Sequence, residues 1–131
     1  MRLSEAILLG SVGSKQGFGP RSMYSNSPTK CAMGAALFVS GIKVNDENGN
    51  DEVEKLWPWV ATYVTPPIKI RSHKNSVYDR DQIRILGVIW RLNDWLKWTR
   101  PQIAAWVATQ EALYDPEVVN QSITEVECVT R

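Results

Sequence analysis

The side chains that most often perform acid–base, nucleophilic or metal chemistry are few in this sequence and lie far apart. His73 is the only histidine, and it stands in a basic segment without a neighbouring carboxylate. The two cysteines, Cys31 and Cys128, form no CxxC pair, so the ligand spacing of a zinc knuckle or ribbon is missing. Cys31 lies in an apolar run, which predicts a buried free thiol. We therefore expect no catalytic residue, no metal site and no cofactor.

Two loops have the composition of ligand-binding loops without their spacing. Residues 10–15 read GSVGSK, but a phosphate-binding loop needs four residues between its glycines and a hydroxyl directly after its lysine. Residues 46–54 are rich in acids, but they lack the regular alternation of ligands and the final glutamate of a calcium loop. Both segments are predicted to be ordinary polar loops.

Basic residues supply the best candidate for a binding surface. The net charge is only +1, but the charges are segregated: residues 44–54 are acidic and residues 69–100 are mostly basic. Arg80, Arg84 and Arg91 are spaced i, i+4 and i+11, which returns to one side of a helix. Such a surface would suit nucleic-acid phosphate or an acidic protein, and the alternative is an ordinary solvated helix face. The residues assigned to this surface are Lys69, Arg71, Lys74, Arg80, Arg84, Arg91 and Arg100.

Asn93 and Asp94 come at the end of a predicted helix, just before a tryptophan-rich turn. Asparagine and aspartate in such a place close a helix end or cap nearby backbone N–H groups, and this structural role is the first interpretation. The alternative is a polar contact to a partner. A mechanism with paired carboxylates is not supported, because no second acid accompanies Asp94 in the pattern.

The elements that must position these residues are mainly helical. Helices are predicted over residues 4–9, 28–40, 51–57, 80–93 and 99–113. Their starts are indicated by Ser4, by Ser27 with Pro28, by Asp79 with Gln82, and by Thr99 with Gln102. Residues 32–39 are apolar nearly all round, which predicts a buried helix at the centre of the domain.

The fold class follows from these elements and from the six tryptophans, which can close a core in a chain of 131 residues. We expect a compact, mainly α domain of four to five helices over residues 1–116, and a loosely attached tail over residues 117–131. Alternation at residues 68–71 allows a short two-stranded element near residues 64–72. The last two helices could be taken for a helix-turn-helix, but the second offers few polar side chains to read bases.

Two blocks of residues carry a resemblance. The first block is Leu3-Ser4-Glu5-Ala6-Ile7 and Gly10, then Gln16-Gly17-Phe18-Gly19 and Cys31-Ala32-Met33-Gly34-Ala35-Ala36-Leu37. The second block is Leu92-Asn93-Asp94, Trp98-Thr99-Arg100 and Gln102-Ile103-Ala104-Ala105-Trp106-Val107. Together they resemble short, uncharacterised proteins of bacteria and bacteriophages over about residues 3–110. Some of those proteins have a CPxC pair after a Trp-Pro segment; no cysteine follows Trp57-Pro58 here before Cys128, so the resemblance implies no metal site.

The resemblance implies a phage or bacterial context and no particular chemistry. We therefore expect a non-enzymatic accessory protein that binds a macromolecular partner, for example as an inhibitor of a host defence complex or as a regulator. A nucleic-acid-binding module and a self-assembling structural protein are the alternatives. A protein partner is favoured, nucleic acid is the second choice, and no membrane contact is expected. The cysteine usage and the lack of a long apolar run predict a soluble protein in the bacterial cytoplasm.

Overall fold

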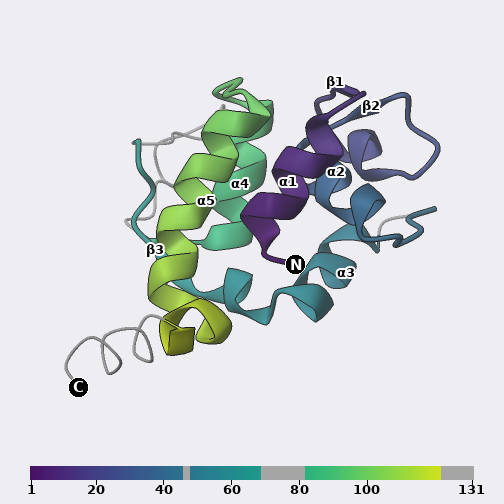
Figure 1. The fold of residues 1–131 in the computed structure, drawn as a ribbon. Helices are drawn as coiled ribbons and strands as arrows, with labels where there is room; N and C mark the ends of the chain where they lie inside the picture. The colour runs from purple at the N-terminus through teal and green to yellow at the C-terminus, as the bar shows by residue number, and fades with distance from the viewer. Residues whose placement is uncertain (46–47, 69–81, 122–131) are drawn as a thin grey trace.

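The computed structural model describes residues 1–45, 48–68 and 82–121, and most of them are helical. Its elements are α1 (Leu3–Ser11), η1 (Pro20–Met23), α2 (Ala32–Val39), α3 (Gly49–Leu56), η2 (Pro58–Ala61), α4 (Ile85–Asp94) and α5 (Arg100–Tyr114), where η marks a short 3₁₀ helix. Residues 116–121 are helical as well. The predicted mainly α fold is confirmed (Figure 1). Among the described helices, none is long and apolar enough to cross a membrane.

Short strands form two separate pairs. β1 (Lys15–Gln16) runs parallel to β2 (Thr29–Lys30), with Lys15 opposite Thr29. β3 (Tyr63–Val64) runs antiparallel to β4 (Ile83–Arg84), with Val64 opposite Ile83. A two-stranded element was predicted near residues 64–72. Its first residue, Val64, does lie in a strand, but the partner strand is formed by residues 83–84. Residues 69–72 lie outside the described part of the chain.

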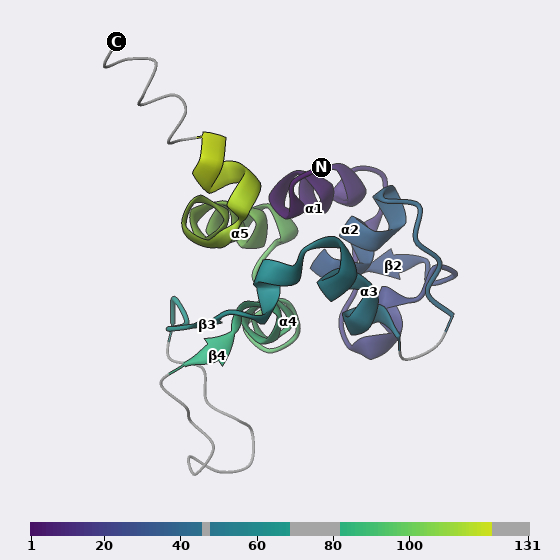
Figure 2. The same ribbon diagram turned by 90° about the horizontal axis from the view of Figure 1, so that it is seen from below.

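The core is built around α1 and α2. Figures 1 and 2 both show α1 between α5 and α2. Its buried side chains Leu3, Ala6 and Ile7 join those of the neighbouring helices in one apolar cluster. The prediction that α2 is buried nearly all round is confirmed for Ala32 through Leu37, although Phe38 is exposed.

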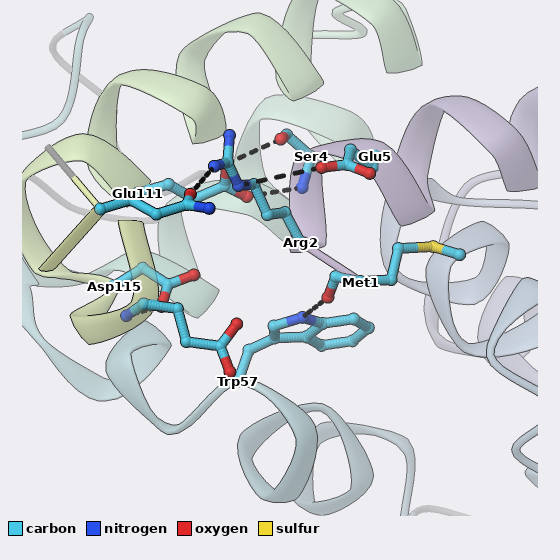
Figure 3. A network of polar contacts seen from close by, with 9 residues as sticks. Met1, Arg2, Ser4, Glu5, Trp57, Glu111 and Asp115 are labelled. Atoms are coloured by element: carbon cyan, nitrogen blue, oxygen red, sulfur yellow. Dashed lines mark hydrogen bonds and ion pairs between the residues drawn. The ribbon is translucent and has the colours of Figure 1, made fainter. Parts of the chain in front are cut away.

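The start of α1 is capped from a distance, not by its own sequence. The N-cap is Arg2, which makes no side-chain capping bond, so the prediction that Ser4 is the cap is wrong. Ser4 lies in the first turn, and its backbone N–H and hydroxyl each donate to Glu111 of α5 at 2.7 Å (Figure 3). A carboxylate is favourable there because the first turn of a helix carries partial positive charge. Glu111 thus joins α1 to α5.

The predicted start of the second helix is also wrong. Ser27 does not cap it; its hydroxyl donates to the Thr29 carbonyl at 2.8 Å. Residues 29–30 pair with β1, and α2 therefore begins only at Ala32. Cys31 is the N-cap, with Sγ accepting the Gly34 N–H at 3.2 Å. The helix end is as expected, because Gly41 after it has φ +75°.

The helix predicted from residue 80 begins at Ile85, because residues 83–84 belong to β4. Its N-cap is Arg84, without a side-chain capping bond, so Gln82 is not part of a capping box. Asp79 lies outside the described residues. The start of α5 is confirmed in full: Thr99 Oγ1 accepts the Gln102 N–H at 3.2 Å, and Gln102 Oε1 accepts the Thr99 N–H at 2.9 Å.

The chain after α5 continues as a helical segment over residues 116–121. Gln121 Oε1 accepts a hydrogen bond from Arg2 Nη2 at 2.6 Å, so this segment contacts the first residues of the chain. The rest of the predicted tail, residues 122–131, lies outside the described residues. The division at residue 116 stays a prediction.

Gly10 provides a test of the α1–α2 contact. A Cβ atom at this position would lie 2.0 Å from the backbone oxygen of Ala35, which has no side-chain freedom with which to withdraw. Gly10→Ala is expected to lower the free energy of unfolding by about 2 kcal/mol, because the two helices must move apart. Urea unfolding followed by circular dichroism measures this change.

Gly87→Ala is the matched control, because it too lies inside a helix. Its Cβ would meet Arg91 Nη1 at 2.8 Å and the Ile83 side chain at 3.0 Å, so its nearest contacts are side-chain atoms and not backbone. The better helix propensity of alanine offsets part of this crowding, so we expect a change of less than about 1 kcal/mol. Equal losses for the two variants would contradict the packing argument.

Candidate functional site

Asn93 joins three segments at the end of α4. Its Oδ1 accepts hydrogen bonds from Gln16 Nε2 at 2.9 Å and from the Ala32 N–H at 3.2 Å. Its Nδ2 donates to the Gly17 carbonyl at 3.0 Å and to Asp94 Oδ1 at 2.8 Å. All four hydrogen-bonding positions of the amide are used, and Asn93 is only 1% exposed. Asn93 is therefore structural, and the alternative of a polar contact to a partner is wrong for this residue.

Asp94 is held differently and keeps one oxygen for further contacts. Its Oδ1 accepts the Gly19 N–H at 3.0 Å as well as the Asn93 amide, which fixes the carboxylate against the loop after β1. Among the described residues, no hydrogen bond reaches Oδ2. Asp94 is partly exposed and lines a cavity, so it can accept a hydrogen bond from a bound group.

This cavity, which we call the α4 cavity, has a volume of about 690 Å³ and opens to solvent. It lies between η1, the start of α2 and the second half of α4. Most of its wall is apolar or aromatic, and both its size and this lining are typical of binding sites. The lining residues are Phe18, Gly19, Pro20, Met23, Cys31, Ala32, Met33, Asn50, Ile89, Trp90, Asn93, Asp94, Trp95 and Lys97.

Two tryptophans line the cavity, and an arginine that is not part of the lining packs against both of their rings. The rings of Trp90 and Trp95 are perpendicular, with centroids 5.2 Å apart. The guanidinium of Arg91 lies 4.3 Å from the Trp90 centroid and 5.3 Å from that of Trp95, and Nη1 donates to the Gly87 carbonyl at 3.0 Å. Burial lowers the pKa of Arg91, but an arginine starts so far above neutrality that it stays charged. The rings are thereby fixed beside a positive charge.

Lys97 also lines the cavity and has an unusual backbone conformation. Its φ is +56°, a left-handed conformation that non-glycine residues seldom adopt. In this conformation the ammonium lies 4.0 Å from the centroid of the half-exposed Phe18 ring. This conformation belongs to the turn that ends α4, in which the Trp98 N–H donates to the Leu92 carbonyl at 2.9 Å. Lys97 also lies just after the C-terminus of α4, where the helix favours a positive charge.

Cys31 lines the cavity, but its thiol is not activated. The predicted buried free thiol is confirmed, with 7% of the residue exposed. Burial raises the pKa of Cys31, so the thiol stays protonated at neutral pH. The protonated form is a poor nucleophile and a poor metal ligand. Within the part of the chain that the structure describes, no three histidine, cysteine or acidic side chains gather as a metal site would require.

The predicted basic surface is not a single surface in the described residues. Lys69, Arg71, Lys74 and Arg80 lie outside them, so their assignment stays a prediction. Arg84 lies in β4, 3.9 Å from Glu54 and 5.5 Å from the Tyr63 ring. Because Arg84 precedes the helix and Arg91 lies inside it, the helical spacing that linked the two is wrong.

Arg100 was assigned to the binding surface as well, and this is wrong because the residue is only 6% exposed. Its guanidinium donates to Ser14 Oγ at 2.8 Å, to the carbonyls of Lys30 and Ser11 at 3.2 Å each, and to the Ser14 carbonyl. Burial lowers the pKa of Arg100. The residue ties α5 to the end of α1 and to β2, and it is not available to a partner.

Sequence reasoning missed Phe18, Trp90, Trp95 and Lys97 as lining residues of one cavity. The tryptophans were assigned to the core. The contacts that bring these rings and Lys97 together are tertiary, so no local pattern in the sequence indicates the site. A comparison of the chain with protein-family models, with curated proteins and with solved structures finds no match.

Proposed function

We propose that this protein is a non-enzymatic accessory protein that binds an acidic segment of a partner protein at the α4 cavity. An apolar or aromatic side chain of that segment enters the cavity, and acidic neighbours pair with the cations beside it. The proposal is carried by one observation: an open, mostly apolar cavity of about 690 Å³ that is lined by Lys97 and by two tryptophans against which Arg91 packs.

The wall of the cavity supports an apolar anchor. Phe18, Trp90 and Trp95 offer rings for stacking, and Met23 and Met33 are flexible side chains that adapt to different shapes. A large side chain buried in such a pocket typically dominates the binding energy of an interface. Asp94 Oδ2 can accept one N–H of the bound segment.

The charges around the cavity support an acidic partner. Arg21 lies next to the lining residue Pro20, and together with Arg91 and Lys97 it outnumbers Asp94. Among the described residues, none of these three cations forms an ion pair with a carboxylate. Cations without internal partners steer and orient an acidic segment.

The lining groups support binding more than catalysis. Asn93 has no unused hydrogen-bonding position, and the Cys31 thiol is protonated. The resemblance to short phage and bacterial proteins supports an accessory role toward a host or phage macromolecule, as an inhibitor of a defence complex or as a regulator, in the bacterial cytoplasm. Nucleic acid is the alternative partner, and the experiment below tests it with single-stranded DNA.

Lys97→Gly tests the proposal without breaking the fold. Glycine adopts a positive φ freely, so the relief of strain offsets the lost contact with Phe18, and the free energy of unfolding should change by less than about 1 kcal/mol. We expect binding of a short peptide with one tryptophan between aspartates to weaken about fivefold or more. Titration followed by the indole N–H resonances of Trp90 and Trp95 measures both the site and the affinity.

Lys43→Gly is the control, since Lys43 is exposed and does not line the cavity, and it should leave peptide binding unchanged. A peptide with lysines in place of the aspartates should bind more weakly than the acidic one. Equal binding of the two peptides, or a titration that moves neither indole, would overturn the proposal. Single-stranded DNA that shifts these indoles when the acidic peptide does not would establish the nucleic-acid alternative, and light scattering of the free protein tests self-assembly.

A further inference from the structure

A second cavity lies on another part of the molecule, between the first residue, η2 and the end of α5. Its volume is about 870 Å³, within the range of small-ligand sites. We call it the N-terminal cavity. The lining residues that matter for its chemistry are Met1, Trp57, Trp59, Tyr114, Asp115 and Glu117. It shares no lining residue with the α4 cavity.

Asp115 is the main polar group of this cavity. It is only 6% exposed, and its Oδ1 accepts the Glu117 N–H at 3.1 Å, as an N-cap does for the helical residues 116–121. Among the described residues, its second oxygen has no hydrogen bond and the carboxylate has no ion pair. A buried carboxylate is costly unless a cation or several donors compensate it. Asp115 is therefore a partly satisfied acceptor in the wall of a cavity.

Arg2, which precedes α1, does not pair with this carboxylate. Arg2 donates to Gln121 Oε1 at 2.6 Å and lies 3.9 Å from Glu5 Oε1. Figure 3 shows the Arg2 guanidinium near Glu111, with Asp115 and Trp57 below it. Glu117 adds a second carboxylate to the lining, and no lysine or arginine side chain is part of it. The lining side chains thus carry two negative charges, and Met1 brings the α-ammonium of the chain to the same lining.

Aromatic rings complete the site. Trp57 Nε1 donates to the Met1 carbonyl at 3.1 Å, which fixes the orientation of its indole (Figure 3). Tyr114, at the end of α5, is exposed and also lines the cavity. Trp59 also lines the cavity, and its buried Nε1 has no acceptor among the described residues. Rings beside carboxylates are the usual environment for a bound organic cation.

We propose that the N-terminal cavity binds an ammonium or guanidinium group carried on an apolar stem. The cation pairs with Asp115 and Glu117, and the stem packs on Trp57 and Tyr114. The group comes either from a free alkyl cation or from an arginine side chain of a peptide. This proposal does not depend on the α4 cavity.

The test uses the full chain and two probes, agmatine and a short blocked peptide with a single arginine. We expect at least one of them to bind and to shift the Trp57 indole N–H resonance, and the stronger probe identifies the source of the cation. Asp115→Asn keeps an N-cap residue of equal quality, so the fold is preserved while the charge is lost. This variant should weaken binding of the stronger probe about tenfold or more, and Glu117→Gln should weaken it less.

Asp51→Asn is the matched control, because Asp51 is exposed on α3 and does not line the cavity. It should leave binding unchanged, as should Lys97→Gly. Three results would each overturn the proposal: no binding of either probe at millimolar concentration, equal affinity of the wild type and Asp115→Asn, or tighter binding of succinate than of agmatine. Peptide binding at the α4 cavity is measured separately, so the failure of one proposal leaves the other standing.

Discussion

Asn93→Leu is expected to lower the free energy of unfolding by about 4 kcal/mol, because leucine has the right size but cannot make any of the four amide hydrogen bonds. The Ala32 N–H at the start of α2 and the Gly17 carbonyl would lose their Asn93 partner where no side chain can replace it. A buried polar group without a partner costs more than the lost bond itself. Urea unfolding monitored by tryptophan fluorescence measures the change.

The neighbouring substitution Asp94→Asn is the control for this result. An asparagine oxygen at this position still accepts from the Gly19 N–H and from the Asn93 amide, so the expected loss is about 1 kcal/mol. A loss for Asn93→Leu no larger than that for Asp94→Asn would show that Asn93 does not hold the three segments together. The same comparison shows whether the loop after β1 depends on the amide or on the carboxylate.

Arg100→Met is expected to lower the free energy of unfolding by about 3 kcal/mol. Methionine fills much of the same volume, but it leaves the carbonyls of Ser11, Ser14 and Lys30 without the guanidinium donor. Because the partners are carbonyls and not carboxylates, the loss should hardly depend on salt concentration. Thermal and chemical unfolding at low and high salt measure both quantities.

Arg100→Lys separates the contribution of the guanidinium geometry to stability from the contribution of its charge. A lysine ammonium keeps the positive charge, but it cannot reach several carbonyls at once as the planar guanidinium does. It should therefore recover less than half of the stability lost in Arg100→Met. If lysine restored the full free energy of unfolding, the positive charge near the end of α1 would matter more than the several hydrogen bonds of the guanidinium.

Local signals in the sequence predicted those elements whose contacts are local. The start of α5 was correct because Thr99 and Gln102 cap each other within one turn. The starts of α2 and α4 were wrong because residues 29–30 and 83–84 pair with strands that lie elsewhere in the chain. Tertiary pairing overrides a capping signal in the same way that it overrides propensity.

The candidate site was less accessible to sequence reasoning than the fold. The structural role of Asn93 was predicted, but its partners come from β1 and α2, more than sixty residues away. Arg100 looks like a surface cation in the sequence because nothing local shows that three carbonyls converge on it. A pattern of charges along the sequence does not reveal which basic side chains are buried and hydrogen-bonded within the fold.

The Ser4–Glu111 contact has a consequence for how the chain folds during synthesis. The two residues are 107 positions apart, so the Ser4 N–H in the first turn of α1 lacks this acceptor until Glu111 has been synthesised. The contact that closes the first turn of α1 thus forms only after α5 has been made. Its apolar residues Leu3 and Ile7 stay partly uncovered until α5 joins α2 around them, and a nascent chain arrested before residue 111 should be a form that chaperones bind readily.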